Sequence, residues 1–154
     1  MPVIEINYNP LQSGAKVIGP AQNLFIHGAF VNVSIAPVPS GSVQPSAIKP
    51  TIGKALIDTG ATFTCVDEDT CLTLGLNSVG IANIKHVDGI SMRPRYPVQI
   101  SFPDFNLPPL NLIGATSVVL NNTTPPFIAL IGRDLLAHFK LTYNGPRGRI
   151  EIAY

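Results

Sequence analysis

Apolar and polar residues alternate in several short segments of the chain. Every second residue is apolar in 31–35 (Val-Asn-Val-Ser-Ile) and in 98–102 (Val-Gln-Ile-Ser-Phe). A period of two residues is typical of a strand with one buried face. Three short, mostly apolar runs predict further strands buried on both faces: 55–57, 117–120 and 127–131.

Turn residues and caps define the remaining predicted elements. Residues 141–143 and 150–154 flank Asn-Gly-Pro-Arg-Gly at 144–148, which predicts a pair of strands joined by a turn. A short helix is expected over 67–74, where Asp67 is a suitable N-cap and Gly75 a C-terminal stop. A second is expected over 133–140, which places Leu135, Leu136 and Phe139 on one face.

Prolines and glycines limit what else the chain can form. There are 15 prolines and 13 glycines, and both residue types disfavour long helices. Residues 36–54 hold four prolines and several serines, and we expect a long surface loop there. The roughly 35 residues before it are too few for a separate core. We therefore expect a single all-β domain over residues 1–154, with one or two short helices.

Composition excludes several classes of protein. The chain is 45% hydrophobic and 12% charged, which is too apolar for an intrinsically disordered protein. It has no apolar run of about 18 residues, so no membrane association is expected. The first ten residues lack the basic and apolar regions of a secretory signal, which favours a cytoplasmic protein. The net charge of +1 comes without a basic cluster, so nucleic acid is not an expected partner.

Candidate metal ligands are scarce. Cys65 and Cys71 are too few for a disulfide framework or a structural zinc site, and we expect both to be reduced core residues. The three histidines, at 27, 86 and 138, are isolated and show no ligand spacing. We therefore expect no metal and no cofactor.

Asp58 differs from the other eight carboxylates in its surroundings. It follows the apolar run 55–57 and precedes Thr59-Gly60-Ala61, whereas most of the others lie among polar or turn residues. A carboxylate at the end of a buried strand is costly unless something compensates it, and functional sites often do so. Gly60 allows a tight turn, and Thr59 offers a hydroxyl for bracing it.

One aspartate cannot both activate a water and protonate a carbonyl oxygen. That chemistry needs two carboxylates that share a proton, one as base and the other as acid. The chain contains a single Asp-Thr-Gly. If Asp58 is catalytic, a second chain must contribute its own Asp58 across a two-fold axis.

Two segments in this order resemble the signatures of the retropepsin-like aspartic proteases. Residues 55–62 (Ala-Leu-Ile-Asp-Thr-Gly-Ala-Thr) resemble the catalytic strand and loop of that family. About seventy residues later, 129–136 (Ala-Leu-Ile-Gly-Arg-Asp-Leu-Leu) resemble its second signature. The resemblance covers about residues 55–154, and more loosely a strand pair between 23 and 35. It is closer to the cellular and bacterial members than to the viral ones.

The resemblance implies a closed, barrel-like fold and a homodimeric aspartic endopeptidase that cleaves peptides without a metal. Asp58 would be catalytic, Thr59 would hydrogen-bond across the dimer, and Gly60 would help to bind the substrate backbone. Ala61 belongs to the same loop. Leu130, Ile131, Gly132 and Arg133 would support the loop from the second signature.

Three further features follow from the resemblance. The family covers its substrate with a hairpin, the flap, for which the best match is 85–92, with Val87, Asp88, Gly89 and Ile90 around a tip at Asp88-Gly89. An ordinary surface hairpin would look the same in sequence. Viral members also have an acidic residue where this chain has Thr62, so Arg133 must find another partner, either Asp134 or a backbone carbonyl. The strand 150–154 is suitable for dimer formation through terminal strands.

Two other functions fit the sequence less well. The chain could be a catalytically inactive module of the same fold that dimerises or binds peptides, although the intact Asp58-Thr59-Gly60 argues against it. It could also be an unrelated β-barrel that contains both motifs by coincidence. The substrate preference of the viral enzymes cannot be transferred, because the residue after the motif differs.

Overall fold

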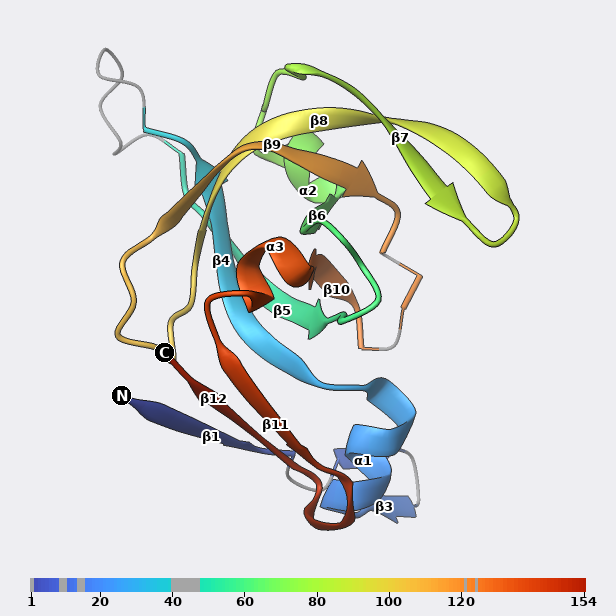
Figure 1. Ribbon diagram of the computed structural model, residues 1–154, viewed down its shortest axis with the longest axis vertical. Helices are drawn as coiled ribbons and strands as arrows, with labels where there is room; N and C mark the ends of the chain where they lie inside the picture. Colours follow the sequence, from blue (N-terminus) through green and yellow to red (C-terminus); the bar gives the residue numbers. More distant parts are fainter. Residues whose placement is uncertain (1, 9–10, 14–15, 40–47, 121, 124) are drawn as a thin grey trace.

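The computed structural model describes residues 2–8, 11–13, 16–39, 48–120, 122–123 and 125–154. These contain twelve strands, three short α-helices and one 3-10 helix (Figure 1). The strands are β1 (Val3–Asn7), β2 (Leu11–Ser13), β3 (Lys16–Ile18), β4 (Phe30–Pro37), β5 (Thr51–Ile57), β6 (Cys65–Asp67), β7 (Gly80–His86), β8 (Gly89–Ser101), β9 (Leu110–Val118), β10 (Phe127–Ile131), β11 (Lys140–Asn144) and β12 (Arg149–Ala153). The helices are α1 (Pro20–His27), α2 (Glu68–Thr73), α3 (Arg133–Leu136) and the 3-10 helix η1 (Gly145–Arg147).

The main sheet closes on itself into a barrel. Its seven strands run in the order β4-β5-β10-β6-β9-β8-β7, and β4 also pairs with β8. That extra pairing, from Ser34↔Ser101 to Pro37↔Val98, joins the two sides of the sheet. β7 lies outside the ring and forms a projecting hairpin with β8 (Figure 1). The expected all-β, closed-barrel fold is therefore confirmed.

The alternating segments supply the core as predicted. Val31, Val33 and Ile35 on β4 are buried, while Asn32 between them is exposed. Val98 and Ile100 on β8 are completely buried from solvent, and Phe102 is buried just beyond that strand. Burial of these aliphatic and aromatic side chains is the main force that favours the closed barrel.

A second, three-stranded sheet holds the ends of the described chain. Its order is β1-β12-β11, and all pairs are antiparallel. The predicted pairing across the 144–148 turn is confirmed, with Leu141↔Ile152 and Tyr143↔Ile150 in register. Because β12 already has a partner on each side, a second chain could extend this sheet only from β1 or β11. The 150–154 strand is thus less accessible than the sequence suggested.

The two predicted helices exist, and a third was missed. α2 has the expected Asp67 cap, whose side chain accepts a hydrogen bond from Thr70 N–H, and Gly75 follows with a φ of 65°. α3 stops at Leu136, four residues short of the predicted end, because Lys140 already begins β11. α1 was not predicted, although Pro20 at its start and Gly28 at its end are typical boundary residues.

Two sequence interpretations need correction. The segment between residues 23 and 35 is not a strand pair, because Asn23 lies within α1 and only β4 is a strand. The loop expected over 36–54 is shorter at both ends, since β4 extends to Pro37 and β5 begins at Thr51. The pairing of β4 with both β5 and β8 explains the extension. Residues 40–47 of that loop lie outside the described part of the chain.

Tyr8 connects the N-terminal segment to the barrel. Its hydroxyl donates to the Phe30 carbonyl at 2.7 Å and accepts from the Phe30 N–H at 2.6 Å. The two rings pack edge to face, 4.7 Å apart, and Tyr8 is only 2% exposed. Burial raises the pKa of this hydroxyl, so it stays protonated and remains able to donate.

Replacement of this hydroxyl tests the connection. We expect Tyr8→Phe to lower the free energy of unfolding by about 1–3 kcal/mol, because both backbone groups of Phe30 lose a buried partner. Denaturant unfolding measures the change, with the half-exposed Tyr143→Phe as matched control. Equal stability of the two variants would show that the tether contributes nothing.

Candidate active site

The two sequence motifs meet because β10 lies between β5 and β6. β10 pairs in parallel with β5, with Leu130↔Leu56 and Ile131↔Ile57 in register. On its other side it pairs antiparallel with β6, with Leu130 opposite Cys65. β5 and β10 end, and β6 begins, at the same side of the sheet, so the loop after β5 and the turn into α3 come into direct contact.

Asp58 is held at the end of β5 by backbone groups. Its own N–H donates to the Ile131 carbonyl at 3.0 Å, which fixes the residue against β10. Its carboxylate oxygen Oδ1 accepts hydrogen bonds from Gly60 N–H at 2.8 Å and Ala61 N–H at 3.2 Å. Among the described residues Oδ2 has no partner, so one oxygen is held by the backbone and the other is available.

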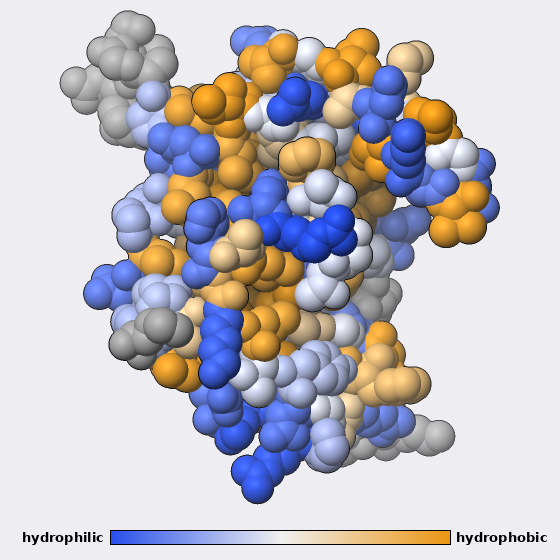
Figure 2. All heavy atoms as spheres, in the orientation of Figure 1, coloured by the Kyte–Doolittle hydropathy of each residue, from blue (hydrophilic) through white to orange (hydrophobic). Residues whose placement is uncertain are grey.

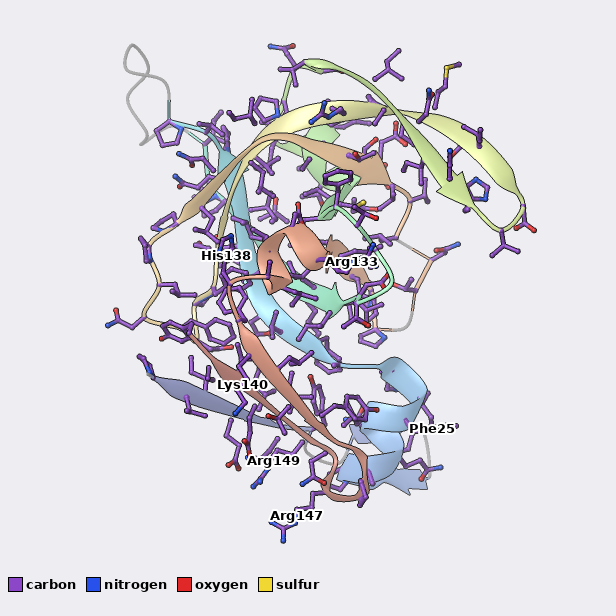
Figure 3. The ribbon with its side chains drawn as sticks, in the orientation of Figure 1. Phe25, Arg133, His138, Lys140, Arg147 and Arg149 are labelled. Atoms are coloured by element: carbon purple, nitrogen blue, oxygen red, sulfur yellow. The ribbon has the colours of Figure 1, made fainter. Side chains whose placement is uncertain are left out.

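The side chain of Arg133 holds the loop mainly through the loop's backbone carbonyl groups. Its Nη1 donates to the carbonyl oxygens of Thr59 at 3.0 Å and Gly60 at 3.2 Å, and its Nη2 donates to the Thr62 hydroxyl at 3.0 Å. Figure 3 shows Arg133 at the start of α3, beside this loop. Of the two partners expected from sequence, the backbone carbonyls are correct and Asp134 is not. The role of Thr62 was missed.

A partly buried network below the loop was also missed. The Thr64 hydroxyl donates to Asp134 Oδ1 at 2.8 Å and accepts from Gly132 N–H at 3.1 Å. The same Asp134 oxygen accepts from Thr64 N–H and Leu135 N–H, each at 2.9 Å. Gly132 also lies against the loop, because a Cβ there would be 2.5 Å from the Phe63 carbonyl carbon. A larger residue would push the two motifs apart.

The remaining predicted support residues occupy the expected elements. Ile131 is 2% exposed and lies in the core, while Leu130 is half-buried on the other face of β10. Thr59 and Gly60 are exposed, and Ala61 is half-buried. Thr59 has its side chain at the surface, where a second chain could reach it.

The predicted flap segment is a long hairpin. Its last pair is His86↔Gly89, so Val87 and Asp88 form the turn, one residue earlier than the predicted tip. Gly89 has a φ of 135°, which favours glycine. Four large apolar side chains of the hairpin are mostly exposed: Ile81, Val87, Ile90 and Met92. Figure 2 shows apolar residues interspersed with hydrophilic ones over this hairpin.

A pocket lies between the loop and the hairpin. It has a volume of about 390 Å³ and is lined by Gly60, Ala61, Thr62, Phe63 and Cys65 on one side and by residues 82–85 of β7 on the other, with Thr116 of β9. Most of its lining is apolar or neutral. It could hold an extended peptide segment beside Asp58.

Both cysteines are free and buried, as expected. Burial, with a smaller effect of the nearby carboxylates of Asp134 and Asp58, raises the pKa of Cys65 to about 11. Burial likewise raises the pKa of Cys71 to about 12. Neither thiol is therefore a reactive nucleophile at neutral pH, although Cys65 lines the pocket.

Comparison with known structures identifies the fold. The chain is similar to a crystal structure of a retropepsin-like aspartic protease from Rickettsia conorii, with a TM-score of 0.52 and 13% sequence identity. The match covers 98% of this chain and 90% of that one. No protein-family model matches the sequence, and no curated protein matches it significantly. The chain thus has the retropepsin-like fold, and at this identity the likeness shows the fold alone.

Within the described residues, no helix has the length and apolarity needed to cross a membrane.

The buried network predicts a large effect of a small change. Thr64→Val keeps the size of the side chain but removes the acceptor of Gly132 N–H and one donor to Asp134. We expect the free energy of unfolding to fall by about 1–3 kcal/mol. The exposed Thr142→Val on β11 is the control, and thermal or denaturant unfolding is the measurement. A Thr64 variant as stable as this control would contradict a supporting role.

Proposed function

We propose that this protein is an aspartic endopeptidase whose active site combines Asp58 from each of two identical chains. The observation that carries the proposal is the geometry of Asp58 on this fold. Backbone N–H groups hold its Oδ1, Oδ2 has no partner among the described residues, and a pocket of about 390 Å³ adjoins the loop.

In the proposed reaction, the two carboxyl groups hold one proton between them. The ionised Asp58 takes a proton from a water molecule, and the resulting hydroxide attacks the peptide carbonyl carbon. The other Asp58 gives its proton to the carbonyl oxygen, which forms a neutral tetrahedral intermediate. A carboxyl group then protonates the amide nitrogen and the C–N bond breaks. A hydroxyl group of the intermediate returns its proton to a carboxylate, so the pair again shares one proton.

The supporting residues have distinct roles in this proposal. Arg133 and the Thr64–Asp134 network hold the loop so that the two Asp58 side chains can approach without steric conflict. Exposed Thr59 is available to hydrogen-bond with the second chain. Gly60 would present its backbone to the substrate, and the hairpin around Val87, Asp88, Gly89 and Ile90 would cover it.

Removal of the base tests catalysis directly. We expect Asp58→Asn to lower kcat/KM for a cleavable peptide by at least about a thousandfold, because an amide cannot accept the proton from water. The asparagine keeps an oxygen for Gly60 N–H and Ala61 N–H, so the fold should persist. A folded variant that keeps more than a small fraction of the activity would rule out Asp58 as the base.

Mixing of chains tests the shared site. Each active site needs two intact copies of Asp58, so excess folded Asp58→Asn chains should inhibit a fixed amount of wild type by forming mixed dimers. Wild-type activity per chain should also fall on dilution through the dimer dissociation constant. An unfolded or non-exchanging competitor is the control. A species that sediments as a monomer and keeps full specific activity would exclude a two-chain site.

The inactive peptide-binding module is the alternative outcome of these tests. If the protein is such a module, wild type and Asp58→Asn bind peptides equally well, and neither cleaves them.

A further inference from the structure

A second pocket adjoins the one beside Asp58. It has a volume of about 460 Å³ and shares Phe63, Ala82 and Thr116 with its neighbour. It contains no residue of the Asp58-Thr59-Gly60 turn and extends instead along β9, where residues 111–116 form one wall. A peptide that lies beside Asp58 could therefore continue past Phe63 into this second pocket.

Arg95 gives this pocket a fixed positive charge. Its Nε donates to the Gly114 carbonyl at 2.9 Å, and Gly114 leaves room for the guanidinium. A Cβ on residue 114 would lie 2.7 Å from Nη2. Among the described residues neither Nη1 nor Nη2 has a partner, so the planar end of the side chain still offers four N–H donors.

Within the described part of the chain, Arg95 forms no ion pair. Arg93, two residues earlier on β8, pairs with Glu68 at 3.6 Å. Asp134 also lines the pocket, but its Oδ1 is occupied by Thr64 and Leu135, and it forms no ion pair with Arg95 in the described chain. Lys85 adds another positive charge in the adjoining pocket.

We propose that Arg95 determines specificity by binding an acidic side chain of the substrate, at a position that does not flank the scissile bond. The inference rests on the proposed peptidase function. A guanidinium can bind a carboxylate through two parallel hydrogen bonds, which a neutral amide side chain cannot match. In a two-fold dimer each chain contributes one such pocket, so acidic preference appears on both sides of the cleaved bond.

The test compares paired peptides that differ only by Glu or Gln at positions on either side of the cleaved bond. Wild type should cleave the Glu peptide with a kcat/KM about three- to tenfold higher, as for a charged pair with an exposed arginine. The ratio should shrink at high salt, because the pair is screened. Since both peptides meet the same enzyme, any loss of folded protein cancels in this ratio.

Four variants separate the contribution of Arg95 from general charge. Arg95→Gln should reduce the Glu-to-Gln ratio of kcat/KM to about one. Arg95→Glu should reverse the preference, in favour of a peptide with Lys at the same position. Gly114→Ala should reduce it while the charge remains, because the added Cβ displaces the guanidinium. Arg93→Gln changes the net charge equally but removes an arginine that is already paired, so it should keep the wild-type ratio.

The outcomes distinguish this inference from the function on which it rests. Cleavage without a Glu preference, or a preference unchanged by Arg95→Gln, overturns the role of Arg95 and leaves the peptidase intact. If no peptide is cleaved, the proposed function fails, and the same Glu and Gln peptides are then compared by binding. Equal dissociation constants in that assay would overturn the acidic site as well.

Discussion

The close contact between Gly132 and the backbone of Phe63 and Thr64 is the constraint on which the candidate site depends. It brings the end of β10 so near the loop after β5 that no side chain fits between them. At this distance Thr64 can reach both Gly132 and Asp134, and Arg133 can reach the loop carbonyls. The position of Asp58 is thus determined by backbone packing rather than by one charged partner.

The arrangement also explains how Arg133 holds the loop without an acidic partner among the described residues. A guanidinium has five donors and can satisfy them with carbonyl and hydroxyl oxygens. Here the Thr59 and Gly60 carbonyls and the Thr62 hydroxyl accept these hydrogen bonds.

Sequence patterns predicted the elements whose signals are local. The alternation in 31–35, the Asp67 cap and the turn at 144–148 each depend on neighbouring residues, and each appears in the structure. The Thr64–Asp134 network joins residues seventy positions apart, and neither residue is unusual in its own segment. The same reason hid the pairing of β1 with β12 and the contact of Arg95 with Gly114.

The length of β8 couples the hairpin to the barrel. Residues 98–101 pair with β4 on one side, and residues 95, 96 and 98–100 pair with β9 on the other, whereas residues 89–94 pair only with β7. The C-terminal end of β8 is therefore anchored in the barrel, whereas its hairpin end is not. A movement of the hairpin tip at Val87 therefore bends β8 where its anchored part begins, around Arg95 and Tyr96. Arg95, which we propose to bind an acidic side chain, lies at this bending point, so an occupied pocket would stiffen the hairpin above it.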